Sequence, residues 1–147
     1  MRLCLLLACL TLAMAVPARA DEMTVDLPRG ETYLGDVGTY LISYQSYGGQ
    51  AVEMPVSWTG HFTDDSGIAY LPNERVLGRR AILLHSPWRV PPGKVQVDYR
   101  LRLPAVTPIR LAFGIAMSPD VAGKSDGVTF SCLLVGAGRD EQLMREH

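Results

Sequence analysis

The chain has 147 residues, with 14 basic and 15 acidic side chains and a formal net charge of −1. This length suits one domain with a hydrophobic core and is too short for two. The basic residues form no patch or stripe in the sequence. Proteins that bind nucleic acids need such a patch to contact the phosphates, so we expect no nucleic-acid partner.

The N-terminal residues have the layout of a secretory signal peptide. Arg2 precedes an almost wholly apolar run over residues 3–16, and Ala18-Arg19-Ala20 places small residues before a cleavage site at Asp21. The run is too short for a membrane span. We therefore predict a signal peptide over residues 1–20 and a secreted or periplasmic protein. A lipoprotein signal with lipidation at Cys9 is the alternative.

Cleavage would leave one domain over residues 21–147, with 12 basic and 15 acidic residues and a net charge of −3. Cys132 would be its only cysteine. A disulfide framework and a zinc-type cysteine cluster are thereby excluded. Cys132 alternates with apolar neighbours, so we expect a small buried residue. A reactive or intermolecular thiol is the alternative.

Short apolar segments, many of them alternating with polar residues, follow one another along the mature chain and end at Gly, Pro, Asn or Asp. Such spacing is typical of strands in an all-β protein. The predicted strands are residues 23–27, 37–45, 56–62, 68–71, 81–85, 95–103, 109–117 and 127–135. Pro72-Asn73 is predicted to be a turn. We expect an antiparallel β-sandwich of the jelly-roll type.

The clearest strand pair lies over residues 109–117 and 127–135, joined by a polar turn. Beyond it, residues 139–147 can form a strand with Gln142, Met144 and Glu146 on one face, or a short helical turn. No further strand follows to close the sandwich. The resulting open sheet edge would pair with another chain or domain.

Several of these segments together resemble a known family. They are His85-Ser86-Pro87-Trp88-Arg89, Pro92-Gly93, Phe113-Gly114-Ile115-Ala116-Met117 and Lys124-Ser125-Asp126-Gly127-Val128-Thr129-Phe130. They resemble the novel carbohydrate-binding modules of exported bacterial proteins, which have a galactose-binding-like jelly roll. The likeness covers residues 55–147. In such modules the element like Glu141-Gln142-Leu143 is followed by further strands, so the chain resembles a module shortened at its C-terminus. The resemblance implies an exported, non-catalytic module that binds carbohydrate or another extracellular ligand.

Sugar recognition needs an exposed aromatic face for the apolar side of a pyranose and polar groups for its hydroxyls. Trp88 is the first candidate because it lies in a loop, and Arg89 beside it offers a planar donor fork. Tyr47 and Tyr70 lie near turns and can stack on a ligand. The alternative for Trp88 is that it caps the core.

Asp120, Ser125 and Asp126 bring oxygen ligands close together in the loop before the last predicted strand, as calcium requires. Three ligands are few for calcium, and Asp126-Gly127 also fits a simple turn. Asp64-Asp65-Ser66-Gly67 has the same two interpretations. No other cofactor is expected.

Two further function classes remain open. One is a structural or assembly module that pairs with another chain through its open edge. The other is a small hydrolase, which would need two facing carboxylates. Glu53, Glu74 and Asp98 are available, but each is placed where a solvated surface charge is expected. We therefore predict that the protein is not an enzyme.

Overall fold

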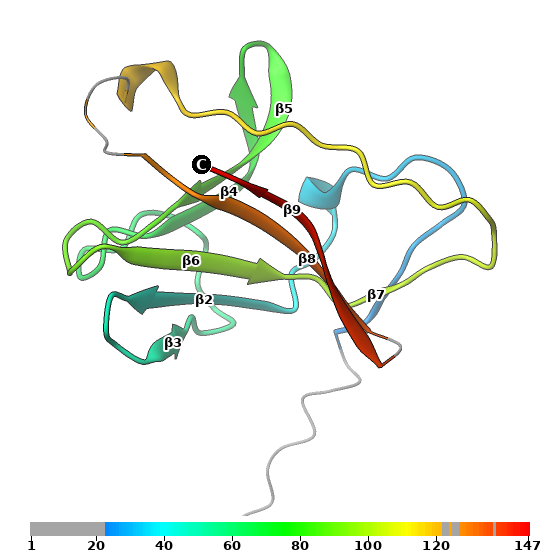
Figure 1. Ribbon diagram of the computed structural model, residues 1–147, viewed down its shortest axis with the longest axis horizontal. Helices are drawn as coiled ribbons and strands as arrows, with labels where there is room; N and C mark the ends of the chain where they lie inside the picture. Colours follow the sequence, from blue (N-terminus) through cyan, green and yellow to red (C-terminus); the bar gives the residue numbers. More distant parts are fainter. Residues whose placement is uncertain (1–22, 122–123, 125–126, 137) are drawn as a thin grey trace, which may run out of the picture.

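The computed structural model describes residues 23–121, 124, 127–136 and 138–147, and the predicted signal peptide lies outside them (Figure 1). The described residues form strands, loops and two single-turn helices, so this part of the chain is all-β. The strands are β1 (Val25–Asp26), β2 (Leu41–Ser46), β3 (Ala51–Glu53), β4 (Ala69–Val76), β5 (Arg79–His85), β6 (Gly93–Asp98), β7 (Leu101–Arg102), β8 (Phe130–Gly136) and β9 (Arg139–Glu146); the 3-10 helices are η1 (Leu34–Asp36) and η2 (Pro119–Val121).

The largest sheet is the antiparallel set β3-β2-β6. β2 pairs with β6 along its whole length, from Leu41 opposite Asp98 to Ser46 opposite Gly93. Val95 and Val97 are half-buried while Gln96 between them is exposed, as the alternating sequence predicted. The predicted strand over residues 95–103 is interrupted after Asp98, and the short β7 pairs with β1 instead. That pair is parallel, which corrects the expectation of a purely antiparallel fold.

The β4–β5 hairpin corrects the predicted turn at Pro72-Asn73. β4 continues through both residues, and the register shift between Leu71 and Glu74 marks an irregularity of the β-bulge kind. Proline is tolerated at such a position because it need not donate to the ladder. The chain turns instead at Leu77 and Gly78, whose φ angles of 51° and 78° suit a tight hairpin.

Two predicted strands do not form. Residues 56–62 contain turns, with the Trp58 N–H donating to the Pro55 carbonyl at 2.9 Å, and Gly60 has a φ of +87° that a strand does not allow. Residues 109–117 run as an irregular path that pairs with no described strand, drawn in yellow in Figure 1. β8 pairs with β9 rather than with this segment. Only two residues separate the two strands in the sequence, which makes the pairing local and lowers the entropy cost of closing the loop.

The buried residues cluster where β4 begins. Ile68 is fully buried, and Ala69, Tyr70 and Val37 lie with it among the residues less than a tenth exposed. Among the described strands and helices, β8 and β9 make extensive contacts only with each other. Their exposed apolar residues include Leu133, Leu134 and Val135. The buried residues of the described chain therefore all lie before β6, and the C-terminal third contributes none of them.

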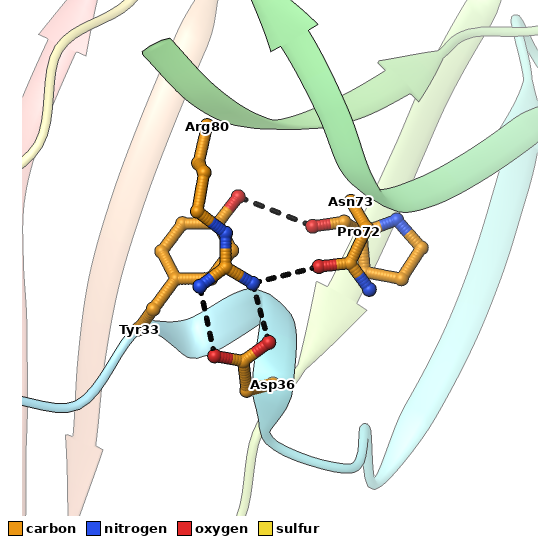
Figure 2. A network of polar contacts seen from close by, with 5 residues as sticks. All are labelled: Tyr33, Asp36, Pro72, Asn73 and Arg80. Carbon is orange, nitrogen blue, oxygen red and sulfur yellow. Dashed lines mark hydrogen bonds and ion pairs between the residues drawn. The ribbon is translucent and has the colours of Figure 1, made fainter.

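A polar network fixes η1 against the β4–β5 hairpin (Figure 2). The Arg80 guanidinium donates to both Asp36 carboxylate oxygens, with Nη1 at 3.0 Å from Oδ2, and Nη2 also donates to Asn73 Oδ1 at 2.8 Å. The guanidinium lies 4.0 Å from the centre of the Tyr33 ring, and the Tyr33 hydroxyl donates to the Pro72 carbonyl at 3.1 Å. Hydrogen bonds from Arg80 hold the pKa of Asp36 below its ordinary value of 3.8.

Candidate functional site

The candidate site is built on the turn Thr63–Gly67, just before β4. The Thr63 and Ser66 hydroxyls hydrogen-bond each other at 2.7 Å, and the Gly67 N–H donates to Thr63 Oγ1 at 3.0 Å. Ser66 is only 2% exposed. The hydroxyls thus satisfy polar groups that this buried turn would otherwise leave unpaired.

The same turn holds the segment that carries Trp88. The backbone N–H groups of Trp88 and Arg89 both donate to the Ser66 carbonyl, at 3.0 and 3.1 Å. Pro87 before them is buried. Gly67 has a φ of +79° and lies against the indole, so that a Cβ added there would overlap Trp88 Nε1 and Cδ1. The backbone that carries Trp88 is therefore fixed on both sides.

Trp88 itself is 60% exposed, although it sits on a buried turn. The Arg89 guanidinium lies 5.0 Å from the centre of the indole ring and donates through Nη1 to the Asp64 carbonyl at 2.9 Å. The exposed carboxylate-bearing residues Asp64 and Asp65 flank it on the turn. A planar apolar ring and a guanidinium on the segment after β5, and two carboxylates on the turn before β4, are thus all exposed.

The exposure of Trp88 distinguishes between the two sequence interpretations. A residue that capped the core would place most of its ring out of water, and Trp88 leaves most of its surface in water. Trp58 is half-buried, and its indole N–H donates to the His61 carbonyl at 3.1 Å. The sequence favoured core packing for Trp58, which alternates with Val56 and Phe62 in a predicted strand, and left both interpretations open for Trp88.

Tyr47 and Tyr70 have different positions in the structure. Tyr47 is 88% exposed in the β2–β3 turn, and its N–H donates to the Pro92 carbonyl at 2.7 Å, which joins this turn to the loop that follows Trp88. Both loops lie at the left end of the molecule in Figure 1. The structure therefore brings the Tyr47 turn to the same end as Trp88 and Arg89.

Tyr70, by contrast, is only 7% exposed, so the expectation that its ring stacks on a surface ligand is corrected. Its hydroxyl hydrogen-bonds the Tyr99 hydroxyl at 3.1 Å. Burial raises the pKa of both phenols above their ordinary value of 10, because the charged form loses its hydration. Tyr70 belongs to the core because it is the second residue of β4, immediately after the buried turn.

The structure also forms a shallow cavity that the sequence did not suggest. It has a volume of about 130 Å³, and it lies between the start of β2, β3 and the chain around Trp58. The lining residues are Met23, Thr39, Tyr40, Leu41, Ile42, Glu53, Met54, Pro55, Val56 and Trp58. Ligand pockets usually hold about 300–1,000 Å³. This cavity can take only a few atoms of a ligand.

The loop considered for calcium is described only in part. Asp120 is exposed in η2, whereas Ser125 and Asp126 lie outside the described residues. Among the described positions no group of three or more His, Cys, Asp or Glu side chains lies close enough to hold a metal ion. Calcium binding at Asp120, Ser125 and Asp126 stays a prediction.

The candidate hydrolase residues are dispersed over different elements. Glu53 is in β3 and Glu74 in β4, while Asp98 in β6 accepts a hydrogen bond from Gln96 Nε2 at 2.9 Å. His85 Nδ1 is 2.8 Å from the Ser86 carbonyl, and its ring contacts Phe62 edge-on.

Cys132 is half-buried in β8 opposite Met144. No helix in the described part of the chain is long and apolar enough to cross a membrane.

Comparison with known proteins found no matching family model, no similar curated protein and no similar solved structure.

Proposed function

We propose that this chain is an exported, non-catalytic module that binds carbohydrate through the loop carrying Trp88 and Arg89. The exposed, anchored Trp88 ring carries the proposal. A flat aromatic surface stacks against the apolar face of a pyranose. Because the ring is already held in place, binding loses less side-chain entropy. The two hydrogen bonds to the Ser66 carbonyl and the contact with Gly67 supply that fixation.

The polar groups beside Trp88 match the hydroxyls of a sugar. Arg89 uses Nη1 for the Asp64 carbonyl. A guanidinium has five N–H donors in all, so this one bond occupies only part of its donor capacity. The Asp64 and Asp65 carboxylates are acceptors on the neighbouring turn, and the Tyr47 turn is bonded to Pro92 in the loop that follows Trp88. Donors and acceptors around one aromatic face are the minimum for orienting a pyranose.

The fold that we propose for this function is a galactose-binding-like β-sandwich of the jelly-roll type. Small sheets, tight turns and near-absence of helix among the described residues support it. Export rests on the N-terminal sequence, in which a basic residue, an apolar run and small residues follow in the order of a signal peptide. The ligand would then be a glycan met outside the cytoplasm.

The test is binding to a panel of glycans, followed by titration of any ligand found. Trp88→Ala should weaken binding at least about tenfold, which corresponds to about 1.4 kcal/mol. Trp88→Phe should retain part of the affinity, since a smaller ring still stacks. Val135→Ala is the matched control, because Val135 is 71% exposed on β8 and lies in a different element. A panel without a saturable ligand, or equal affinity in Trp88→Ala, would refute the proposal.

A further inference from the structure

The segment Ile109–Met117 is apolar, yet it pairs with no other described part of the chain. Its five large apolar residues are each between 41% and 50% exposed: Ile109, Leu111, Phe113, Ile115 and Met117. Within the described residues, the backbone of this segment takes part in no strand pairing and no turn hydrogen bond. Nine consecutive residues therefore offer both their side chains and their backbone donors and acceptors to a partner.

We propose that Ile109–Met117 is the interface of a homodimer, in which two copies of the segment pair antiparallel about a twofold axis at Phe113. In that register Phe113 lies opposite itself, Leu111 lies opposite Ile115, and Ile109 lies opposite Met117. Directly opposed residues of an antiparallel pair point to the same face of the sheet. All large apolar side chains of both copies would then lie on one face.

The other face of the proposed pair carries small residues. Ala112 would lie opposite Gly114, and Arg110 opposite Ala116. Arg110 is the only charged residue in the segment, and this register keeps the two arginines apart. A shift of the register by one residue would place large side chains opposite small ones. A shift by two residues would again place large side chains opposite each other, but only the register centred on Phe113 pairs all five of them. The sequence is thus most completely self-complementary about Phe113, as the symmetric contact of a twofold dimer requires.

The size of the patch sets the strength of the dimer. A large aromatic side chain buries about 150–250 Å² when fully enclosed, so five half-exposed side chains leave on the order of 400–500 Å² open in each copy. A stable interface buries about 800 Å² per partner, and weak, transient ones fall below about 600 Å². Pairing of the backbone adds to the contact. We therefore infer a reversible dimer whose population depends on protein concentration.

The first experiment is sedimentation velocity of the full chain across a wide concentration range. The expected result is a monomer–dimer equilibrium that glycans do not change, so this inference can fail without affecting the proposed carbohydrate site. Phe113→Lys places two like charges opposite each other on the axis and should raise the dissociation constant at least about tenfold. Val135→Lys, a change at a similarly exposed position on β8, should leave it unchanged. A melting curve of each variant shows that it folds.

The second experiment tests the register by cross-linking. With Cys4, Cys9 and Cys132 replaced by Ser, Phe113→Cys should form a disulfide-linked dimer, because opposed Cα atoms lie about 4.5–5.5 Å apart. Leu111→Cys alone should not cross-link, whereas a mixture of Leu111→Cys and Ile115→Cys should. Val135→Cys serves as the control for random collision.

The two experiments have defined outcomes. A monomer at every concentration, a dimer that persists in Phe113→Lys, open-ended oligomers, or equal cross-linking of Phe113→Cys and Val135→Cys would each overturn the inference. Concentration-dependent dimers that Phe113→Lys abolishes, with the predicted pattern of cross-links, would establish it.

Discussion

Residues 63–70 and residues 109–117 are both predominantly uncharged, but the structure treats them in opposite ways. The first region forms a hydrogen-bonded turn and the start of β4, and it contains Ile68, which is fully buried. In the second, Ile115 is 41% exposed, and no described strand pairs with the segment. Each region contains an isoleucine, a residue type that favours β-strands. A side chain is therefore buried only where another element packs against its segment. Alternation of apolar and polar residues creates an apolar face, but it does not determine whether another element covers that face.

The largest effect should come from shortening an isoleucine in each region. Ile68→Ala should lower the free energy of unfolding by about 2–5 kcal/mol, because it removes buried methyl groups and leaves a cavity. Ile115→Ala should change it by less than about 0.5–1 kcal/mol, as expected for a surface side chain. Urea denaturation at low protein concentration, where the monomer dominates, measures both. Equal losses would show that residues 109–117 are packed in the monomer.

The next effect isolates the contact between the turn and Trp88. Gly67→Ala and Gly78→Ala both place a side chain at a φ near +78°, which costs about 1–2 kcal/mol. Only at Gly67 would the new Cβ also overlap the Trp88 indole. Gly67→Ala should therefore be the more destabilising by about 1–3 kcal/mol in urea denaturation.

A double-mutant cycle assigns that difference to its cause. In a Trp88→Ala background the obstructing indole is gone, so Gly67→Ala and Gly78→Ala should become similarly destabilising. If Gly67→Ala kept its larger cost there, the turn itself and not the indole would be the source of the strain.

The smallest effect concerns the network of Figure 2. Arg80 holds the pKa of Asp36 below 3.8, so the folded chain takes up this proton at lower pH than the unfolded chain. The contribution to stability is present above pH 3.8 and is lost as the pH falls through the lower folded value. Asp36→Asn should lower the melting temperature slightly at neutral pH and reduce the further loss on acidification.

Asp26→Asn is the matched control for that experiment, because Asp26 accepts a single bond from Arg102 at 2.9 Å on the surface. A paired bidentate contact is stronger than one exposed bond, so the control should change the melting temperature less. If the acid dependence of the melting temperature is the same in Asp36→Asn and in the unsubstituted chain, the network does not stabilise the fold.

The sequence predicted elements best where an alternating or continuous apolar segment finds a strand partner in the structure. β2, β5 and the first half of the strand over residues 95–103 form close to their expected positions. Prediction was wrong for residues 56–62, where Gly60 adopts a positive φ that the alternating pattern does not reveal. It was also wrong at Pro72-Asn73, since a bulge absorbs the proline within β4.

The candidate site was predictable only in part, for a similar reason. The loop position of Trp88 and Arg89 followed from the flanking prolines. Their anchoring on the Ser66 carbonyl joins residues more than twenty positions apart, and no local pattern encodes such a contact. The burial of Tyr70 was not predicted, because its contacts, such as the hydrogen bond with the Tyr99 hydroxyl, join residues far apart in the sequence.

The apolar segment over residues 109–117 also affects the tendency of the protein to aggregate. A strand has two edges, and pairing about Phe113 consumes one of them, so the remaining edge could recruit further copies into a growing cross-β ladder. Pro108 and Pro119 bracket the segment, and Arg110 interrupts its uncharged run. Such gatekeeper residues keep ladders short. Replacing Pro108, Arg110 or Pro119 should therefore promote fibril formation without changing the fold.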